Sequence, residues 1–152
     1  MIIRQLLEHD KPPIELLLSA DPSLEKVEAY LRRGECFAAF TGEEISGVYV
    51  LLPTRPDMVE LVNVAVAEQY QGHGLGKKLV QHAVQTAAGA GFRTMEVGTG
   101  NSSINQLALY QKCGFRIVGV DFDFFTRHYP EAIYENGILC RDMLRLTREL
   151  HH

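Results

Sequence analysis

A glycine-rich segment at residues 71–76 is the part of the chain best suited to hold a phosphate group. Three glycines in six residues let the backbone turn sharply and approach a ligand without side chains in the way. A helix is expected to start here, so its free N–H groups and the positive end of its dipole would face the ligand. A pyrophosphate is the natural occupant, and a plain glycine-rich turn is the alternative. The residues are Gln71, Gly72, His73, Gly74, Leu75 and Gly76.

A second candidate segment, at residues 121–134, alternates acidic and aromatic side chains. Aromatic rings next to carboxylates form a suitable pocket for a cationic amine. We therefore expect four residues of this segment to contact a substrate, and a partly buried strand followed by a polar loop is the alternative. The four are Asp121, Asp123, Phe124 and Tyr129.

Length and composition indicate one globular domain. The chain has 152 residues, of which 46% are hydrophobic and 22% charged, and we assign residues 1–150 to a single domain. The formal net charge is −4, without a dense basic run, so neither nucleic acid nor a membrane is expected as a partner. Residues 1–13 have no basic start and no small-residue cleavage site, so we expect no signal peptide.

The cysteines and histidines do not form a recognisable metal site. Cys36, Cys113 and Cys140 are widely spaced, and no CxxC or HExxH pattern occurs. Three separate cysteines are typical of reduced thiols, so we expect a cytoplasmic protein without a metal. His151 and His152 are set aside as a candidate remnant of a purification tag.

Strands dominate the expected first half of the chain. The helix in this half would bury Leu24, Val27 and Leu31 on one face. Residues 62–66 are apolar at nearly every position, as expected for a central strand covered on both faces. The expected elements are a strand at 1–6, a helix opened by Asp21 and Pro22 and stopped by Gly34, a hairpin of strands 36–40 and 45–52, and, after a break at 53–56, a strand at 59–66.

Strands and helices alternate in the second half. A helix at 75–90 would bury an apolar stripe that consists of Leu75, Leu79, Ala83, Val84 and Ala87. A strand at 94–98, a helix opened by Asn101 or Ser102 and closed by Gly114, and strands at 117–120 and 138–146 would follow. The pattern predicts a mixed α/β (α+β) protein with a single mixed central sheet of about six or seven strands flanked by helices.

Three segments together resemble the GCN5-related N-acetyltransferase (GNAT) family. The family's acetyl-coenzyme A loop reads Q/R-x-x-G-x-G/A, which Gln71, Gly74 and Gly76 match. LALYQKCGF is similar to the family's late helix, and VNVAVAEQYQGHG to its strand-four exit. More narrowly, GTGNSSINQLALYQKCGFRI resembles a subgroup of small bacterial members. The resemblance covers nearly the whole chain and implies the acyl-CoA N-acyltransferase fold.

The resemblance also implies how acetyl-CoA, the co-substrate, is held. Backbone N–H groups of residues 71–76 would bind the pyrophosphate. Val64, Ala65 and Val66 would pair with the pantetheine arm, leaving a backbone donor of Val64 or Ala65 aimed at the thioester oxygen. Many family members carry an asparagine seven residues before the helix tyrosine; Ser103 stands there, so we expect Asn101 or Asn105 to take that role.

Two side chains are implied as the acid and the base. Tyr110 occupies the position of the family's proton donor to the leaving thiolate, with packing in the core as the alternative. Glu60 is the candidate base, standing six residues before Val66 as a glutamate does in some members, and strand alternation would place it on the face of Val62, Val64 and Val66. An exposed glutamate is the alternative reading, and Glu96 is the reserve choice for the base.

The resemblance therefore implies a cytoplasmic bacterial N-acetyltransferase that moves an acetyl group from acetyl-CoA to a primary amine by direct attack in a ternary complex. The acidic aromatic segment favours a small cationic acceptor similar to an aminoglycoside or a polyamine. The alternatives are acetylation of a protein lysine or N-terminus, and a regulatory module that binds acyl-CoA without turnover. A homodimer is a further expectation from the resemblance.

Overall fold

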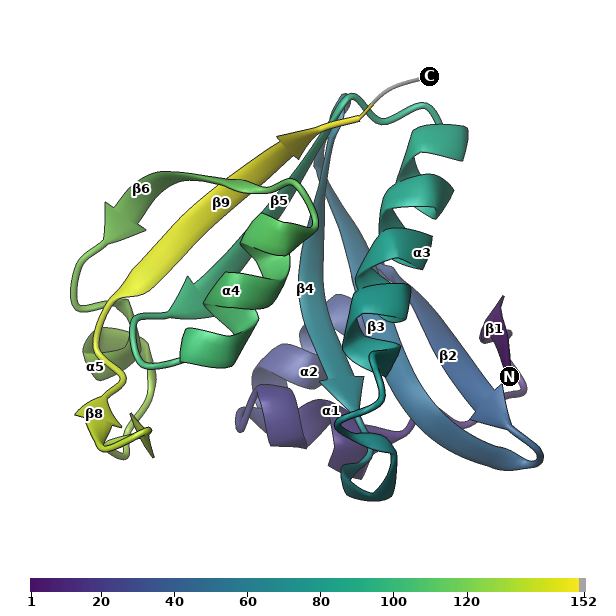
Figure 1. Cartoon of the computed structure of the whole chain (residues 1–152), viewed down its shortest axis with the longest axis horizontal. Coiled ribbons are helices and arrows are strands. Elements are labelled where there is room, and N and C mark those ends of the chain that lie inside the picture. Colours follow the sequence, from purple (N-terminus) through teal and green to yellow (C-terminus); the bar gives the residue numbers. More distant parts are fainter. Residues whose placement is uncertain (151–152) are drawn as a thin grey trace.

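A seven-stranded sheet with helices on both faces forms the protein in the computed structural model, which describes residues 1–150 (Figure 1). The strand order is β1-β2-β3-β4-β5-β9-β6, and all neighbours are antiparallel except β4 and β5. The mixed sheet expected from the sequence is confirmed. The strands are β1 (Ile2–Gln5), β2 (Glu35–Thr41), β3 (Glu44–Arg55), β4 (Met58–Val66), β5 (Thr94–Gly100), β6 (Arg116–Asp121) and β9 (Met143–Glu149). His151 and His152 lie outside the described residues.

Two pairs of helices cover opposite faces of the main sheet. A small hairpin, β7 (Tyr134–Glu135) and β8 (Ile138–Leu139), stands outside the main sheet. The helical elements are α1 (Ile14–Ala20), α2 (Leu24–Arg33), a 3-10 turn η1 (Glu68–Tyr70), α3 (Leu75–Gly89), α4 (Ile104–Lys112) and α5 (Phe124–His128). Helices α3 and α4 pack over the larger core cluster, whereas α1 and α2 cover the smaller cluster on the other face of β3 and β4.

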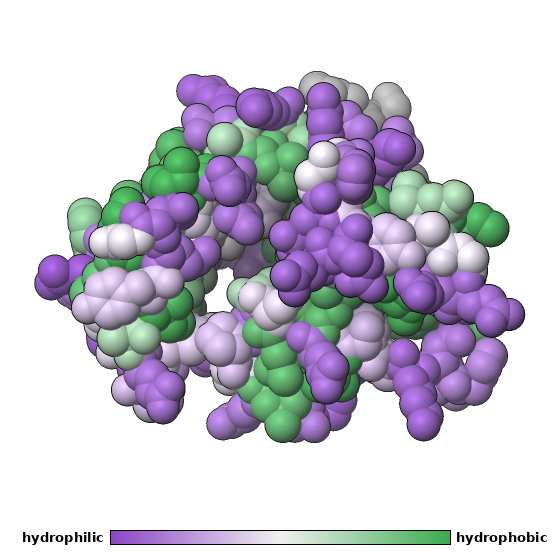
Figure 2. Space-filling model, turned by 60° about the horizontal axis from the view of Figure 1, so that its bottom comes forward, coloured by the Kyte–Doolittle hydropathy of each residue, from purple (hydrophilic) through white to green (hydrophobic). Residues whose placement is uncertain are grey.

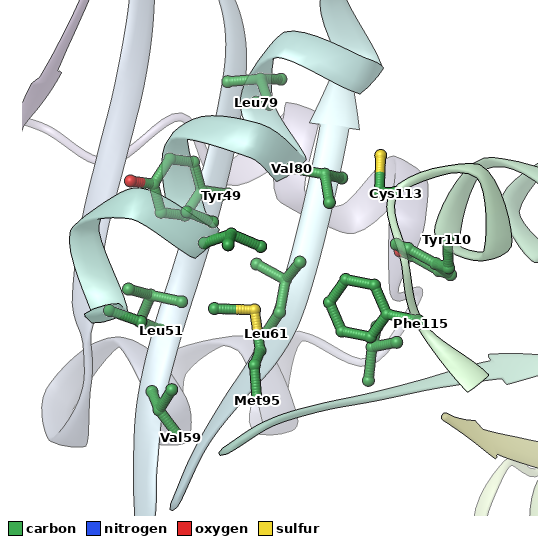
Figure 3. Packing of buried hydrophobic residues seen from close by; sticks show 14 of the residues in the cluster. Tyr49, Leu51, Val59, Leu61, Leu79, Val80, Met95, Tyr110, Cys113 and Phe115 are labelled. Atoms are coloured by element: carbon green, nitrogen blue, oxygen red, sulfur yellow. The ribbon is translucent and has the colours of Figure 1, made fainter. Parts of the chain in front are cut away.

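Helix α3 matches its prediction closely. The five residues of its expected apolar stripe are all buried, together with Val80. Figure 3 shows Leu79 above Tyr49, and Val80 above Leu61 and Met95 of the sheet. The period of 3.6 residues fixed this face without any knowledge of the partner strands.

Several predicted boundaries are wrong for local reasons. Helix α1 and helix α5 were not expected. Helix α2 is capped by Ser23, whose hydroxyl accepts from the Lys26 N–H, and Asp21 lies before the cap. Strand β3 continues through Pro53 to a bulge rather than breaking there. Ser103, without a side-chain capping bond, takes the N-cap of α4 in place of Asn101 or Ser102. The expected strand 138–146 is divided into β8 and β9.

A bulge in β4 reverses its side-chain alternation. Asn63 pairs with Val50 and Leu61 pairs with Leu51, so Val62 is an additional residue without a partner in β3. Side chains before and after a bulge therefore change faces. Val64 and Val66 pack against the larger cluster, while Val62 packs against the smaller one. The expectation that Glu60 shares a face with Val64 and Val66 is wrong for this reason.

Strands β4 and β5 are paired over only a short length. Their register contains three pairs, which join residues 58–60 of β4 to residues 94–96 of β5. Beyond Glu60 and Glu96 the two strands diverge, as Figure 1 shows. On their edge away from β3, the last six residues of β4 therefore face an opening rather than β5.

The buried side chain of Asn63 ties the helical layer to β4 beside this opening. Its amide nitrogen donates to the Leu17 carbonyl (3.0 Å) and to the Tyr30 hydroxyl (2.7 Å). The Leu17 carbonyl can only accept, which fixes the orientation of the amide. The Tyr30 hydroxyl in turn donates to Asp21 at 3.4 Å. One side chain therefore connects α1, α2 and the bulged strand.

We expect Asn63→Ala to lower the free energy of unfolding by about 2 kcal/mol, because the substitution leaves a buried carbonyl and hydroxyl without this donor. Tyr30→Phe keeps the bond from Asn63 to the Leu17 carbonyl and removes the bond to Tyr30 together with the long bond to Asp21, so it should cost about half as much. Urea unfolding monitored by circular dichroism measures both. Equal stability of the Asn63 variant and the wild type would contradict this role.

Candidate active site

Two adjoining cavities lie where β4 and β5 separate. We name them the loop groove, which follows residues 71–76, and the acidic pocket, which lies between α1, β5 and α5. Their volumes are about 370 Å³ and about 490 Å³. Figure 2 shows the molecule hollowed near its centre. The two cavities share the lining residues Ser19, Ala20, Val64, Gln106 and Tyr110, so ligands in both would meet.

The glycine-rich segment forms one wall of the loop groove. Gly72 and Gly74 have φ values of +82° and +80°, a conformation that side chains disfavour. Gly74 is the N-cap of α3, and no side chain caps the first N–H groups of that helix. A Cβ at Gly76 would lie 3.5 Å from Leu109 and 3.9 Å from Val66, both of which line the groove. The segment thus offers free backbone donors on a surface kept clear of side chains.

The end of β4 forms the opposite wall. Val64, Ala65 and Val66 all line the loop groove, on the stretch of strand that has no neighbour in β5. The Gln71 side chain donates to the Val66 carbonyl at 3.0 Å, which links the strand end to the loop. An extended ligand arm could pair with this open strand edge as an additional strand would.

The two asparagines expected to hold a ligand have different positions. Asn105 lines the loop groove. Asn101 lies outside both cavities: its side chain donates to the Leu139 carbonyl and accepts from the backbone N–H groups of Arg141 and Asp142. These bonds fix the turn that leads into β9. His73, also expected at the ligand, is exposed and does not line the groove.

Tyr110 lies at the junction of the two cavities. Helix α4 presents it inward, where its ring makes an edge contact with Phe115 at 5.9 Å between centroids. Burial raises the pKa of its hydroxyl to about 12, and the nearby Cys113 adds to this shift. Within residues 1–150 the hydroxyl has no hydrogen-bond partner, so it is free to donate to a ligand. It remains protonated at neutral pH.

The acidic pocket carries two carboxylates, those of Asp21 and Glu135, and no Lys, Arg or His among its described lining residues. Asp21 accepts from the Tyr129 hydroxyl at 2.8 Å, which connects the α1–α2 junction to the segment after α5. Glu135 accepts from the Ser103 hydroxyl at 2.7 Å. Phe125 and Tyr129 supply aromatic walls. Carboxylates and aromatic rings together suit a cationic ligand.

The carboxylates expected to line this pocket lie elsewhere. Asp121 is paired with Arg145 (3.2 Å) and Arg127 (3.6 Å), and Asp123 with Arg141 (2.8 Å). Neither lines the pocket, and neither does Phe124, whose ring lies tilted against that of His128 at 4.6 Å between centroids. Each aspartate therefore has an arginine as its counter-ion. Of the four residues expected to contact substrate, Tyr129 alone is part of the lining.

Two pocket residues were missed by sequence reasoning. Asp21 was interpreted as a helix cap, and its position opposite Tyr129 depends on a contact across 108 positions of the chain. Glu135 is the last residue before a tight turn, in which Asn136 and Gly137 both have positive φ values. An Asn-Gly pair is a strong hairpin signal. That signal could have placed the β7–β8 hairpin, which carries Glu135 to the pocket wall.

Glu60 stands where β4 and β5 begin to separate, directly paired in register with Glu96. It is half-buried. Burial and the neighbouring Glu96 raise the pKa of its carboxyl group, while Arg145 opposes this shift. It does not line either cavity, but Val62, two residues further along β4, lines the acidic pocket. Glu60 therefore lies near the acidic pocket along β4 without forming part of its wall.

In the part of the chain that the structure describes, no group of three His, Cys, Asp or Glu side chains is arranged to hold a metal ion. No helix among residues 1–150 is both long enough and apolar enough to span a membrane.

Comparison with known proteins identifies the family. The model of the acetyltransferase (GNAT) family matches residues 3–115. The uncharacterized N-acetyltransferase YvbK of Bacillus subtilis is 60% identical over 136 residues, which cover 90% of this chain and 88% of that protein. A GNAT family acetyltransferase from Elizabethkingia anophelis, solved with acetyl-CoA bound, superposes with a TM-score of 0.96 at 44% identity, covering 98% of this chain and 97% of the other.

A second solved structure is equally similar in shape. The IAA acetyltransferase from Bacillus cereus superposes with a TM-score of 0.94 at 56% identity, and the match covers 98% of this chain and 99% of that one. The open edge of β4 and the uncapped start of α3 suit the acetyl-CoA site that these relatives have. The chain belongs to the GNAT family of N-acetyltransferases, in the group of YvbK, and uses acetyl-CoA as its acetyl donor.

Proposed function

We propose that this enzyme acetylates the amine of a small cationic molecule bound in the acidic pocket while acetyl-CoA occupies the loop groove. The observation that carries the proposal is that the two cavities meet at Val64 and Tyr110. Both substrates would be present at once, so the amine attacks directly in a ternary complex. Holding two reactants together removes much of the entropic cost of their encounter.

The loop groove has the features that acetyl-CoA requires. The uncapped N–H groups at the start of α3 would bind its pyrophosphate, because a helix N-terminus favours an anion. The open edge of Val64, Ala65 and Val66 would pair with its extended arm, and Asn105 is placed to add a side-chain bond. Acetyl-CoA supplies an activated acetyl group and a thiolate leaving group. A backbone N–H of Val64 or Ala65 would stabilise charge on the carbonyl oxygen.

Tyr110 is the proposed proton donor to the leaving thiolate. Its hydroxyl lies where the cavities meet and has no other described partner. Its raised pKa keeps the proton in place throughout the neutral range. General acid catalysis of this kind contributes about 100-fold or more to a rate.

Tyr110→Phe should therefore lower kcat by about 100-fold and leave the affinity for acetyl-CoA almost unchanged. The control is Tyr70→Phe, because Tyr70 also lines the loop groove but its hydroxyl is bonded to Glu44 at 2.8 Å. Steady-state kinetics and calorimetric titration with acetyl-CoA provide the two readouts. An equal loss of kcat in both variants would contradict the assignment.

The acceptor class follows from the charge of the acidic pocket. Asp21 and Glu135 would attract a cation, and the Phe125 and Tyr129 rings would contact its apolar parts. The expectation of a small cationic amine is thus kept, although its proposed contacts move from Asp121 and Asp123 to Asp21 and Glu135.

The three cysteines are free thiols, which supports the proposed cytoplasmic location.

We expect Asp21→Asn to raise KM for a cationic acceptor by about tenfold, since one charge-assisted contact is lost, with a small effect on kcat. Asparagine can still accept from the Tyr129 hydroxyl, so the pocket wall is preserved. Asp123→Asn is the matched control, because Asp123 lies outside the pocket. A similar rise in KM for the control would contradict the assignment.

A panel of acceptors tests whether the charge or the shape of an amine determines its acetylation. Polyamines, aminoglycosides, amino acids and short lysine peptides would be compared by mass spectrometry with acetyl-CoA, and IAA would be included because the Bacillus cereus relative is named for it. Preferential acetylation of small polycations supports the proposal. Acetylation of anionic acceptors alone, or of protein amines alone, would overturn it.

Glu60 is the proposed base that removes the extra proton of the amine through water. The pH dependence of the free energy of unfolding reports the burial of the Glu60 carboxyl group independently of activity. The folded protein holds the Glu60 proton to higher pH than the unfolded chain, so ionisation lowers stability as the pH rises above the ordinary value of 4.5. Glu60→Gln should therefore match the wild type at acidic pH and become more stable than it near neutral pH.

Urea unfolding over a pH series measures this difference. The control is Glu28→Gln on the exposed face of α2, which should follow the wild type at every pH. In the same series, the base role predicts that the acidic limb of the wild-type kcat profile disappears in Glu60→Gln. Parallel stability curves for Glu60→Gln and the wild type would contradict the burial of an ionised carboxylate.

A further inference from the structure

Strand β6 forms one edge of the sheet and carries a row of exposed apolar side chains. Ile117, Val118 and Val120 are 46%, 61% and 44% exposed, and Phe122, directly after the strand, is 67% exposed. Figure 2 shows hydrophobic residues along the left side of the molecule, where β6 lies in Figure 1. The outer edge of β6 faces no other strand of the seven-stranded sheet.

The other edge of the sheet is protected, which makes β6 unusual. Edge strands commonly avoid pairing with another chain by being short or by carrying charges. Strand β1 has four residues, and two of them, Arg4 and Gln5, are bonded to Asp10 and Glu35. The sequence of β6, by contrast, is RIVGVD, with charges only at its two ends.

A bulge at Val118 gives β6 a self-complementary pattern. Ile117 and Val120 stand opposite Leu146 and Leu144 of β9, which both pack on the larger core cluster. Those two β6 residues therefore share one face, although an odd number of positions separates them. Without the bulge they would lie on opposite faces.

The charged ends of the strand share the other face. Arg116 and Asp121 stand opposite Thr147 and Met143 of β9. Among residues 1–150 Arg116 has no ion-pair partner. The Asp121 carboxylate is paired with Arg145 at 3.2 Å and with Arg127 at 3.6 Å, and its side chain is still 36% exposed, which leaves it accessible to a further cation.

We propose that β6 pairs antiparallel with β6 of a second copy of this chain, about a two-fold axis between Val118 and Gly119. Arg116 of each copy then faces Asp121 of the partner subunit, and Ile117 faces Val120 of the partner subunit. In each of these four contacts the two facing side chains lie on the same face of the sheet. The two seven-stranded sheets then join into one continuous sheet. Such self-complementarity is what an isologous interface requires.

This surface also lies close to the acidic pocket in the chain. Asp123 is the N-cap of α5, and α5 carries Phe125 into the pocket wall. Pairing of β6 would fix the strand from which that helix starts. The interface itself contains none of the residues proposed for catalysis or cofactor binding, so its test is independent of acetyl transfer.

Val118→Glu tests the surface by placing two carboxylates at the axis. Leu24→Glu is the matched control, since Leu24 is an apolar side chain 48% exposed on α2. Sedimentation equilibrium should find a dimer for the wild type and for Leu24→Glu, and a dissociation constant at least about tenfold higher for Val118→Glu. A monomeric wild type, or a dimer that both variants leave equally intact, would overturn the proposal.

A charge exchange tests the register. Arg116→Asp alone and Asp121→Arg alone each place like charges opposite one another in the homodimer and should weaken it. A mixture of the two variants restores both opposite-charge pairs, so heterodimers should form with an affinity close to that of the wild type. Far-ultraviolet circular dichroism checks that each variant is folded. A folded mixture that associates no better than the separate variants would overturn this register.

Discussion

The short pairing between β4 and β5 is the constraint on which the site depends. Only three residue pairs join the two strands, and both strands continue beyond the last of them. A backbone edge that is not paired within the sheet needs another partner, because buried N–H and C=O groups are costly when unsatisfied. The opening between the strands can therefore receive an extended ligand on β4 and a second ligand beside β5.

Four features keep the opening in place. The bulge at Val62 changes the course of β4, and Asn63 anchors the strand to α1 and α2. On the β5 side, Gly98 leaves room for Met143 to lie against the strand, since a Cβ there would be 2.6 Å from its sulfur. The larger core cluster under α3 and α4 makes the opposite face rigid. The bulge and Asn63 are neighbours in β4, whereas Gly98 and the core residues of α3 and α4 come from distant parts of the chain, yet all act on the same pair of strands.

Sequence reasoning succeeded where the determining interactions are local. The face of α3 follows from a helical period, and the glycine conformations at 72 and 74 follow from residue type. It failed where the outcome depends on distant segments. The face of Glu60 was predicted by simple alternation, which the bulge at Val62 reverses.

The carboxylates of the acidic pocket show the same limit. Asp121 and Asp123 looked suited to a cation until their arginine partners from distant positions were known, whereas Asp21 reaches the pocket only because Tyr129 comes back to it from α5. Local patterns thus indicated the family and the conformation of the glycine-rich loop. The acidic pocket could be recognised only in the assembled chain.

A crystal structure of the enzyme with coenzyme A and an acetylated polyamine would test this arrangement most directly. We predict that the coenzyme arm runs along Val64–Val66 with its sulfur beside the Tyr110 hydroxyl, and that the polyamine lies in the acidic pocket with a nitrogen near Asp21 or Glu135. A polyamine bound outside that pocket, or a coenzyme sulfur remote from Tyr110, would contradict it.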